Sequence, residues 1–185
     1  SRTGSTQAIS HNLGSTPGMI LAKRVTGGGN WAVYHRSIPN YALRLNQAAS
    51  TGAIGDPEVY FGNNSSVVAP TATQFTVGGV DDINLTGETY IAYLWAHNEA
   101  AFGEDSDEVI MKCDTCTGTQ GNNILDLGFE PSFCLSKTDD NSNHWKLRDE
   151  MQGWANTYGN TGDMHFTPGS TADASTSNIG WASTT

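Results

Sequence analysis

The chain repeats part of itself at an offset of 114 residues, and no other feature of the sequence restricts its fold as much. Residues 13–23 read LGSTPGMILAK and residues 127–137 read LGFEPSFCLSK, so Leu, Gly, Pro, Leu and Lys recur in register without a gap. The match continues to Trp31 in the first copy and Trp145 in the second. Because the shared residues are typical of turns and strands, we expect both copies to form the same supersecondary unit.

Each copy has the sequence pattern of a β-hairpin. The turn Leu-Gly-x-x-Pro bends the chain, because Gly allows a positive φ and Pro fixes its own φ. A strand is predicted after the turn, over residues 19–23 and 133–137, and another follows a polar loop, over residues 31–34 and 145–148. In the last of these, apolar and charged residues alternate as Trp-Lys-Leu-Arg, which is the period of a half-buried strand. An apolar strand is also expected before each turn.

The rest of the chain adds short strands and many turns. We expect strands over residues 42–45, 75–77, 89–96 and 108–113, and at most one helical turn, over residues 149–152. Gly, Thr, Ser and Asn together account for 73 of the 185 residues, which suits closely spaced strands joined by turns. The pattern predicts an all-β fold, an antiparallel β-sandwich.

The alignment of the two copies sets the expected domain boundaries. Residues 1–97 form the first sandwich repeat, residues 98–107 an acidic linker, and residues 108–185 the second repeat. The first repeat lacks a counterpart of the strand at 108–113, and the second is truncated before its last strands. We therefore expect a segment of a longer repetitive chain, with strand exchange between neighbouring subunits as the alternative.

Charge and hydropathy exclude two classes of partner. The chain carries 9 Lys and Arg against 19 Asp and Glu, a net charge of −10, and its few cations do not cluster. Phosphate neutralisation needs clustered cations, so no nucleic-acid binding is predicted. No run of 18 apolar residues occurs, so we expect no membrane insertion.

Neither cofactor nor metal is predicted. Cys113 and Cys116 form a lone CxxC without the second pair that a zinc site needs. The five histidines show neither HxH nor HExxH spacing. Calcium is an alternative, because four residues match positions 1, 3, 5 and 12 of an EF-hand loop: Asp139, Asn141, Asn143 and Glu150. His144 stands where that loop needs Gly, so a solvated hairpin tip is the favoured interpretation.

Carbohydrate contact is a further candidate activity, since aromatic rings stack on sugar faces and amides hydrogen-bond hydroxyls. Aromatic residues near amides in predicted loops are Tyr41, Tyr60 and Phe61 with Asn63 and Asn64, and Trp154 with Asn156 and Tyr158. Three tryptophans lie in apolar strands and are expected in the core: Trp31, Trp95 and Trp145. No Gly-x-Ser-x-Gly elbow is present and no catalytic set is predicted, so we do not expect an enzyme.

The order of several segments carries a family resemblance. The segments HNLGSTPGMILAKR, YIAYLWA, FGEDSDEVIMKC and LGFEPSFCLSK with HWKLRDEMQG resemble a repeated module of tailed-bacteriophage virion proteins, common in phages of marine and cyanobacterial hosts. The module has the pattern Gly-Phe-x-Pro followed by an apolar strand ending in Lys, then a Trp strand. The resemblance implies a concanavalin-like or lectin-like jelly-roll β-sandwich in a tail fibre or tail spike.

The resemblance also sets the expected function. It implies a structural virion protein assembled in the host cytoplasm, a segment of a tail fibre or related appendage. Its expected partners are other virion proteins and copies of itself, as a homo-oligomer such as a trimer, and host surface glycans. The alternatives are a carbohydrate-binding receptor-recognition module, a capsid decoration or head-fibre protein, and a bacterial extracellular adhesin or filament subunit.

Overall fold

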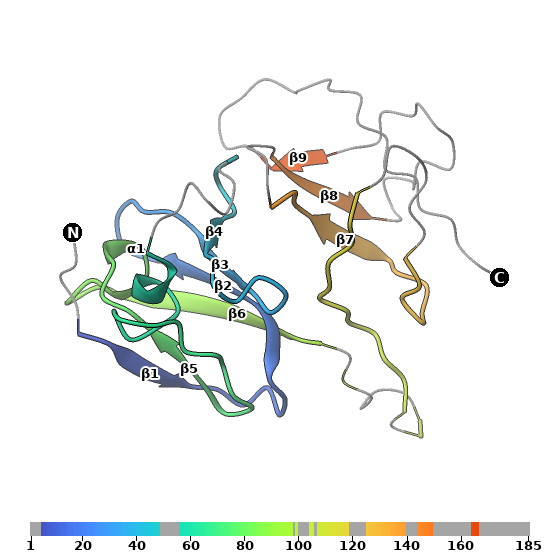
Figure 1. The fold of residues 1–185 in the computed structure, drawn as a ribbon, viewed down its shortest axis with the longest axis horizontal. Coiled ribbons are helices and arrows are strands. Elements are labelled where there is room, and N and C mark those ends of the chain that lie inside the picture. The colour runs from blue at the N-terminus through green and yellow to red at the C-terminus, as the bar shows by residue number, and fades with distance from the viewer. Residues whose placement is uncertain are drawn as a thin grey trace.

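The chain folds into antiparallel β-sheets with almost no helix (Figure 1). The computed structural model describes residues 5–48, 56–97, 99, 104–105, 107–118, 125–139, 144–149 and 164–166. Its strands are β1 (Gln7–Ser10), β2 (Pro17–Arg24), β3 (Ala32–His35), β4 (Leu43–Arg44), β5 (Gln74–Val77), β6 (Tyr90–Ala96), β7 (Phe133–Ser136), β8 (Trp145–Asp149) and β9 (Met164–Phe166). The helical segments are η2 (Pro57–Val59) and α1 (Asp81–Asn84). In this part of the chain no helix could cross a membrane.

A four-stranded sheet in the order β4-β3-β2-β6 forms the centre of the fold. Its central strand β2 is buried on both faces over Ile20–Ala22, which explains its continuous apolar run. Ile20 pairs with Tyr34 of β3 and with Leu94 of β6. The strands predicted over residues 19–23, 31–34, 42–45 and 89–96 are the four strands of this sheet.

The first hydrophobic core lies between this sheet and the two-stranded sheet β1-β5. Phe75 and Val77 of β5 and Ile83 of α1 are buried in it. Its other buried residues come from the central sheet and from the segment around η2: Ile20, Ala22, Ala32, Tyr34, Ala42, Val59, Tyr60 and Phe61. This core therefore joins segments from both ends of the first predicted repeat.

A second core covers the opposite face of the central sheet. Leu21, Val33 and Leu43 on that face surround the indole of Trp145, which is 4% exposed. Its indole N–H donates a hydrogen bond of 2.9 Å to the carbonyl oxygen of Arg44. In Figure 1 the three-stranded sheet β7-β8-β9 lies on the β4 side of the central sheet, away from β1 and β5.

The β7-β8 hairpin pairs in the same register as the β2-β3 hairpin. Leu21 pairs with Val33 in the first hairpin, and Leu135 pairs with Leu147 in the second, 114 residues further on for both partners. Each of the other Cα pairs of β2-β3 recurs in β7-β8 at the same offset. The pairing of the hairpin thus follows the repeated sequence.

One expectation for the secondary structure is wrong, and a second falls mostly outside the described residues. Residues 109–113 form no strand, because the N–H of Cys113 donates to the Nδ1 atom of His97 rather than to a neighbouring strand. The helical turn expected over residues 149–152 does not begin at Asp149, which ends β8, and residues 150–152 lie outside the described residues. The helical turns that do form, η2 and α1, were not predicted. The Asp56-Pro57 pair at the start of η2 is a signal that could have indicated it.

Candidate functional site

A cluster of polar side chains around Asp82 is the densest hydrogen-bonded group in the described part of the chain. Asp82 lies in the single turn of α1, and its Oδ1 atom accepts a 3.0 Å bond from the N–H of Asn30. Its Oδ2 atom accepts bonds from the Asn30 amide at 3.0 Å and from the Tyr60 hydroxyl at 3.1 Å. The carboxylate therefore fixes the loop between β2 and β3 against the segment around η2.

Arg44 at the end of β4 completes this Asp82 cluster. Its guanidinium lies 3.4 Å from the Asp82 carboxylate, donates to the Tyr60 hydroxyl at 2.6 Å, and donates to Gln47 at 3.1 Å. The same group lies over the Tyr60 ring, 5.8 Å from its centroid. Four segments that are far apart in the sequence thus meet in one charged, hydrogen-bonded network.

The chemistry of the Asp82 cluster is that of a structural network. Burial raises the pKa of Asp82, but hydrogen bonds from Asn30 and Tyr60 and the charge of Arg44 outweigh it and hold the pKa below its usual range. Burial raises the pKa of Tyr60. A carboxylate held ionised by several donors is a poor proton acceptor, so the cluster is better suited to fixing loops than to acid–base chemistry.

The predicted carbohydrate-contact residues do not form one site. Tyr60 and Phe61 are each 2% exposed, so neither ring has a face that could stack on a sugar, and the prediction is corrected for both. Tyr41 is 46% exposed, so its ring is accessible for stacking on a sugar. The remaining aromatic and amide candidates, Trp154, Asn156 and Tyr158 of the second predicted repeat, lie outside the described residues.

The two predicted asparagines shape a turn. The Oδ1 atom of Asn63 accepts bonds from the N–H groups of Ser65 and Ser66, at 3.1 and 2.8 Å. The Oδ1 atom of Asn64 accepts a 2.7 Å bond from the N–H of Gly79, and its φ is 67°. Both amide oxygens are therefore engaged by the protein itself.

An aromatic row on the central sheet was missed by the sequence analysis. Tyr93 lies between Trp31 and Trp95, with ring centroids 6.3 Å apart on each side. The two tryptophans are half-buried at the margin of the second core, and Tyr93 is 46% exposed. Of the three tryptophans expected in the core, Trp145 alone is buried. The alternation within β6 could have indicated that Tyr93 and Trp95 share a face.

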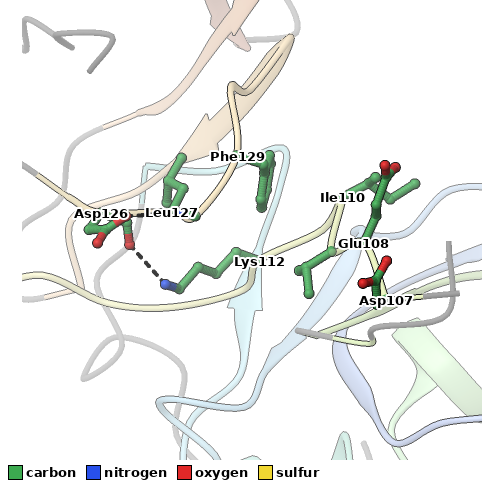
Figure 2. Close-up of a pocket in the computed structure, with 9 residues that line it drawn as sticks. Asp107, Glu108, Ile110, Lys112, Asp126, Leu127 and Phe129 are labelled. Atoms are coloured by element: carbon green, nitrogen blue, oxygen red, sulfur yellow. Dashed lines mark hydrogen bonds between the residues drawn. The ribbon is translucent and has the colours of Figure 1, made fainter. Parts of the chain in front are cut away.

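A hollow of about 700 Å³ opens between the extended segment 107–112 and the turn at 126–129 (Figure 2). Figure 2 shows Leu127 and Phe129 on one side of it and Lys112 on the other. The Lys112 ammonium donates a 2.9 Å bond to the carbonyl oxygen of Asp126. The lining holds carboxylates, one ammonium and apolar groups, but neither a hydroxyl, a thiol nor an imidazole among its side chains.

The CxxC motif lies at a tight contact between three segments. A Cβ atom added at Gly18 would lie 2.7 Å from the Cβ of His97 and 2.8 Å from the Cβ of Cys113, so glycine is needed there. Burial raises the pKa of the Cys113 thiol to about 11, and its Sγ donates to the Ala96 carbonyl oxygen at 3.7 Å. The thiol is therefore protonated at neutral pH, while Cys116 of the motif is exposed.

No group of three or more potential metal ligands occurs among the residues that the structure describes. Of the four calcium candidates, Asp139 is described, and Asn141, Asn143 and Glu150 lie outside the described residues. The calcium alternative therefore stays a prediction.

The contact at His97 predicts acid sensitivity. Burial lowers the pKa of His97 and the nearby Arg36 lowers it further; burial likewise lowers the pKa of His35. The Nδ1 atom of His97 accepts a 3.0 Å bond from the Cys113 N–H, and protonation would place a hydrogen there. At pH values below the unfolded pKa of about 6.5, the unfolded chain binds more protons than the folded chain. The contribution of these histidines to stability is therefore fully present above this pH and is lost as the pH falls toward their lowered pKa in the folded chain.

The measurement is the melting temperature between pH 7.5 and pH 5. In His97→Asn the amide oxygen takes the place of Nδ1 as acceptor and the titrating group is gone, so the acid-induced drop should shrink. It should shrink further in the double variant with His35→Asn. An unchanged drop in the double variant would show that neither imidazole is held neutral by the fold.

Comparison with known proteins gives one result. A family model described as a domain of unknown function (DUF7483) matches residues 1–180. Neither a curated protein nor a solved structure matches the chain. Since the match runs through both predicted repeats, the chain belongs to the DUF7483 family.

Proposed function

We propose that the chain is a structural virion protein: a segment of a phage tail fibre or related appendage, built from two tandem β-sandwich repeats of the jelly-roll type. The resemblance of its ordered segments to a phage virion module motivates the proposal. The observation that carries it is the packing of equivalent residues from the two repeats against each other.

Equivalent faces of the two repeats meet in the second core. Leu21 and its counterpart Leu135 belong to this core, and so do Trp31 and its counterpart Trp145. A contact made by equivalent faces uses the repeated residues themselves and is isologous, so it joins the repeats in pairs. Contacts between successive pairs, through their other surfaces, would then extend the structure, as contacts between neighbours do in repeat proteins.

The polar groups of the chain also fit a scaffold. The Asp82 cluster fixes loops, and the hydrogen-bonding oxygens of Asn63 and Asn64 fix a turn. Contact with host glycans would fall to Tyr41, which is the exposed aromatic residue of the predicted set in the first repeat. We therefore propose assembly as the main activity and glycan contact as secondary.

Immunogold electron microscopy of phage particles encoding this chain tests the proposal. An antibody against the chain should label a tail appendage. Label on the head would favour the capsid decoration alternative instead. Particles that carry no label while the chain is found on the host surface would contradict a virion role and favour an adhesin.

A further inference from the structure

Strand β6 ends the central sheet and leaves one row of backbone groups without a strand partner in the described part of the chain. The N–H of Val25 bonds to the carbonyl of Thr89, so the hydrogen-bonded pairs with β2 fall on the odd residues Ile91, Tyr93 and Trp95. The N–H and C=O groups of the even residues Tyr90, Ala92 and Leu94 must then point away from β2. The bond from the Cys113 thiol to the carbonyl of Ala96 agrees with this assignment.

The sequence of this edge does not protect it against pairing. Natural edge strands are commonly short, or carry charges, prolines or bulges that prevent association. The opposite edge of the same sheet, β4, follows this rule, with two residues of which one is Arg44. In contrast, β6 has seven residues that read YIAYLWA, with neither a charge nor a proline.

The exposed face of β6 is apolar as well. Ile91 is 41% and Tyr93 is 46% exposed, although both are large hydrophobic side chains. Tyr93 stacks on Trp31 and Trp95, which border the core around Trp145. The exposed apolar surface is therefore continuous with the face on which the two repeats already meet.

We propose that β6 pairs antiparallel with β6 of a second copy of this chain, about a two-fold axis at Ala92. In this register Ala92 faces Ala92 of the second copy, and Tyr90 faces Leu94, so the outward N–H and C=O groups of both strands are satisfied. On the exposed face, Ile91 packs against Tyr93 of the second copy. Two central sheets become one continuous sheet across the axis.

A second copy fits this edge because the strand is complementary to itself. The small side chain of Ala92 lies at the axis, where a larger residue would meet its own copy. The chain as a whole is strongly acidic, with a net charge of −10, but β6 brings no charge to the contact. On the same face the nearest charged side chain of β2 is Lys23, the cross-strand partner of Ile91, and β2 lies one strand in from the paired edge. The β6 edge is then the surface through which the self-association in the proposed function takes place. The role of this pairing in assembly rests on the proposed function.

Two variants test the pairing without removing a bond within the sheet. Ala92→Pro deletes an N–H that points away from β2, and its ring blocks the edge. Tyr93→Lys places a charge on the exposed face at the contact. Tyr41→Lys is the matched control, because Tyr41 has the same exposed fraction of 46% and directly precedes β4, the strand at the opposite edge of the sheet from β6. Circular dichroism melting checks that each variant is folded.

Sedimentation equilibrium of the 185-residue chain over a range of concentrations measures the association. The unmodified chain and Tyr41→Lys should associate equally, and Ala92→Pro and Tyr93→Lys should weaken association about tenfold or more. If the unmodified chain associates and both β6 variants associate as well as it does, pairing through β6 is overturned and self-assembly by another surface stands. If the unmodified chain stays monomeric at every concentration, both the pairing and the self-association in the proposed function are overturned.

Discussion

Gly78→Ala is expected to lower the free energy of unfolding by about 3 kcal/mol or more, which is a large part of the stability of an ordinary domain. A Cβ atom at this position would lie 2.5 Å from the carbonyl carbon of Val59 and 2.6 Å from its Cα. These are backbone atoms, so no side-chain rotation can relieve the overlap. The N–H of Gly78 also bonds to the carbonyl of Tyr60 at 3.0 Å, which holds the two segments together.

Chemical denaturation followed by tryptophan fluorescence measures this change. The matched control is Gly28→Ala, since a Cβ atom there would meet nothing within 4 Å. We expect the control to change the free energy of unfolding by less than about 0.5 kcal/mol. Equal stability of the two variants would contradict the close approach of β5 to η2.

The strands of the central sheet could be predicted because local sequence determines them. The turn before β2 needs Gly14, whose φ is 81°, and the corresponding Gly128 has a φ of 78°. The apolar run of β2 and the alternation of β8 then fix their extents to within a residue or two. Equal spacing in the two copies even fixes the register of both hairpins, since Leu21 and Val33 recur as Leu135 and Leu147.

The candidate sites could not be predicted in the same way, because tertiary contacts define them. Tyr60 and Phe61 stand beside Gly62 and two asparagines, which is the composition of an exposed loop. The short helix η2 nevertheless turns both rings inward, and Phe61 packs 5.6 Å from Tyr34 between ring centroids. The Asp82 cluster likewise joins residues that are far apart in the sequence, so no local motif reveals it.

At residues 109–113 the local sequence predicts a strand that the fold does not form. Its apolar residues, Val-Ile-Met, have a high strand propensity, and the sequence predicts a strand there. Propensity alone does not supply a partner, and the N–H of Cys113 bonds to an imidazole instead. Ile110 is consequently 53% exposed.

Trp145→Ala is expected to cost about 3–5 kcal/mol, because it empties the centre of the core that joins the β7-β8 hairpin to the central sheet. The indole is 4% exposed and contacts the face of the central sheet that carries Leu21, Val33 and Leu43. Trp145→Phe should cost less, since it keeps an aromatic ring and loses the hydrogen bond to the Arg44 carbonyl, worth about 1 kcal/mol. The measurements are the free energy of unfolding and the protection of β7 and β8 amides in hydrogen exchange.

The control for Trp145→Ala is Phe133→Ala on the same hairpin. Phe133 is 56% exposed, so its removal takes little apolar surface out of contact and should change stability by less than about 0.5 kcal/mol. If the repeats pack through equivalent faces, Trp145→Ala alone should release the β7-β8 hairpin, and its amides should exchange faster while those of β2 and β3 stay protected. Equal free energies of unfolding and equal amide exchange in Trp145→Ala and Phe133→Ala would show that the hairpin does not pack on the central sheet. The face-to-face packing that carries the proposed function would then be refuted.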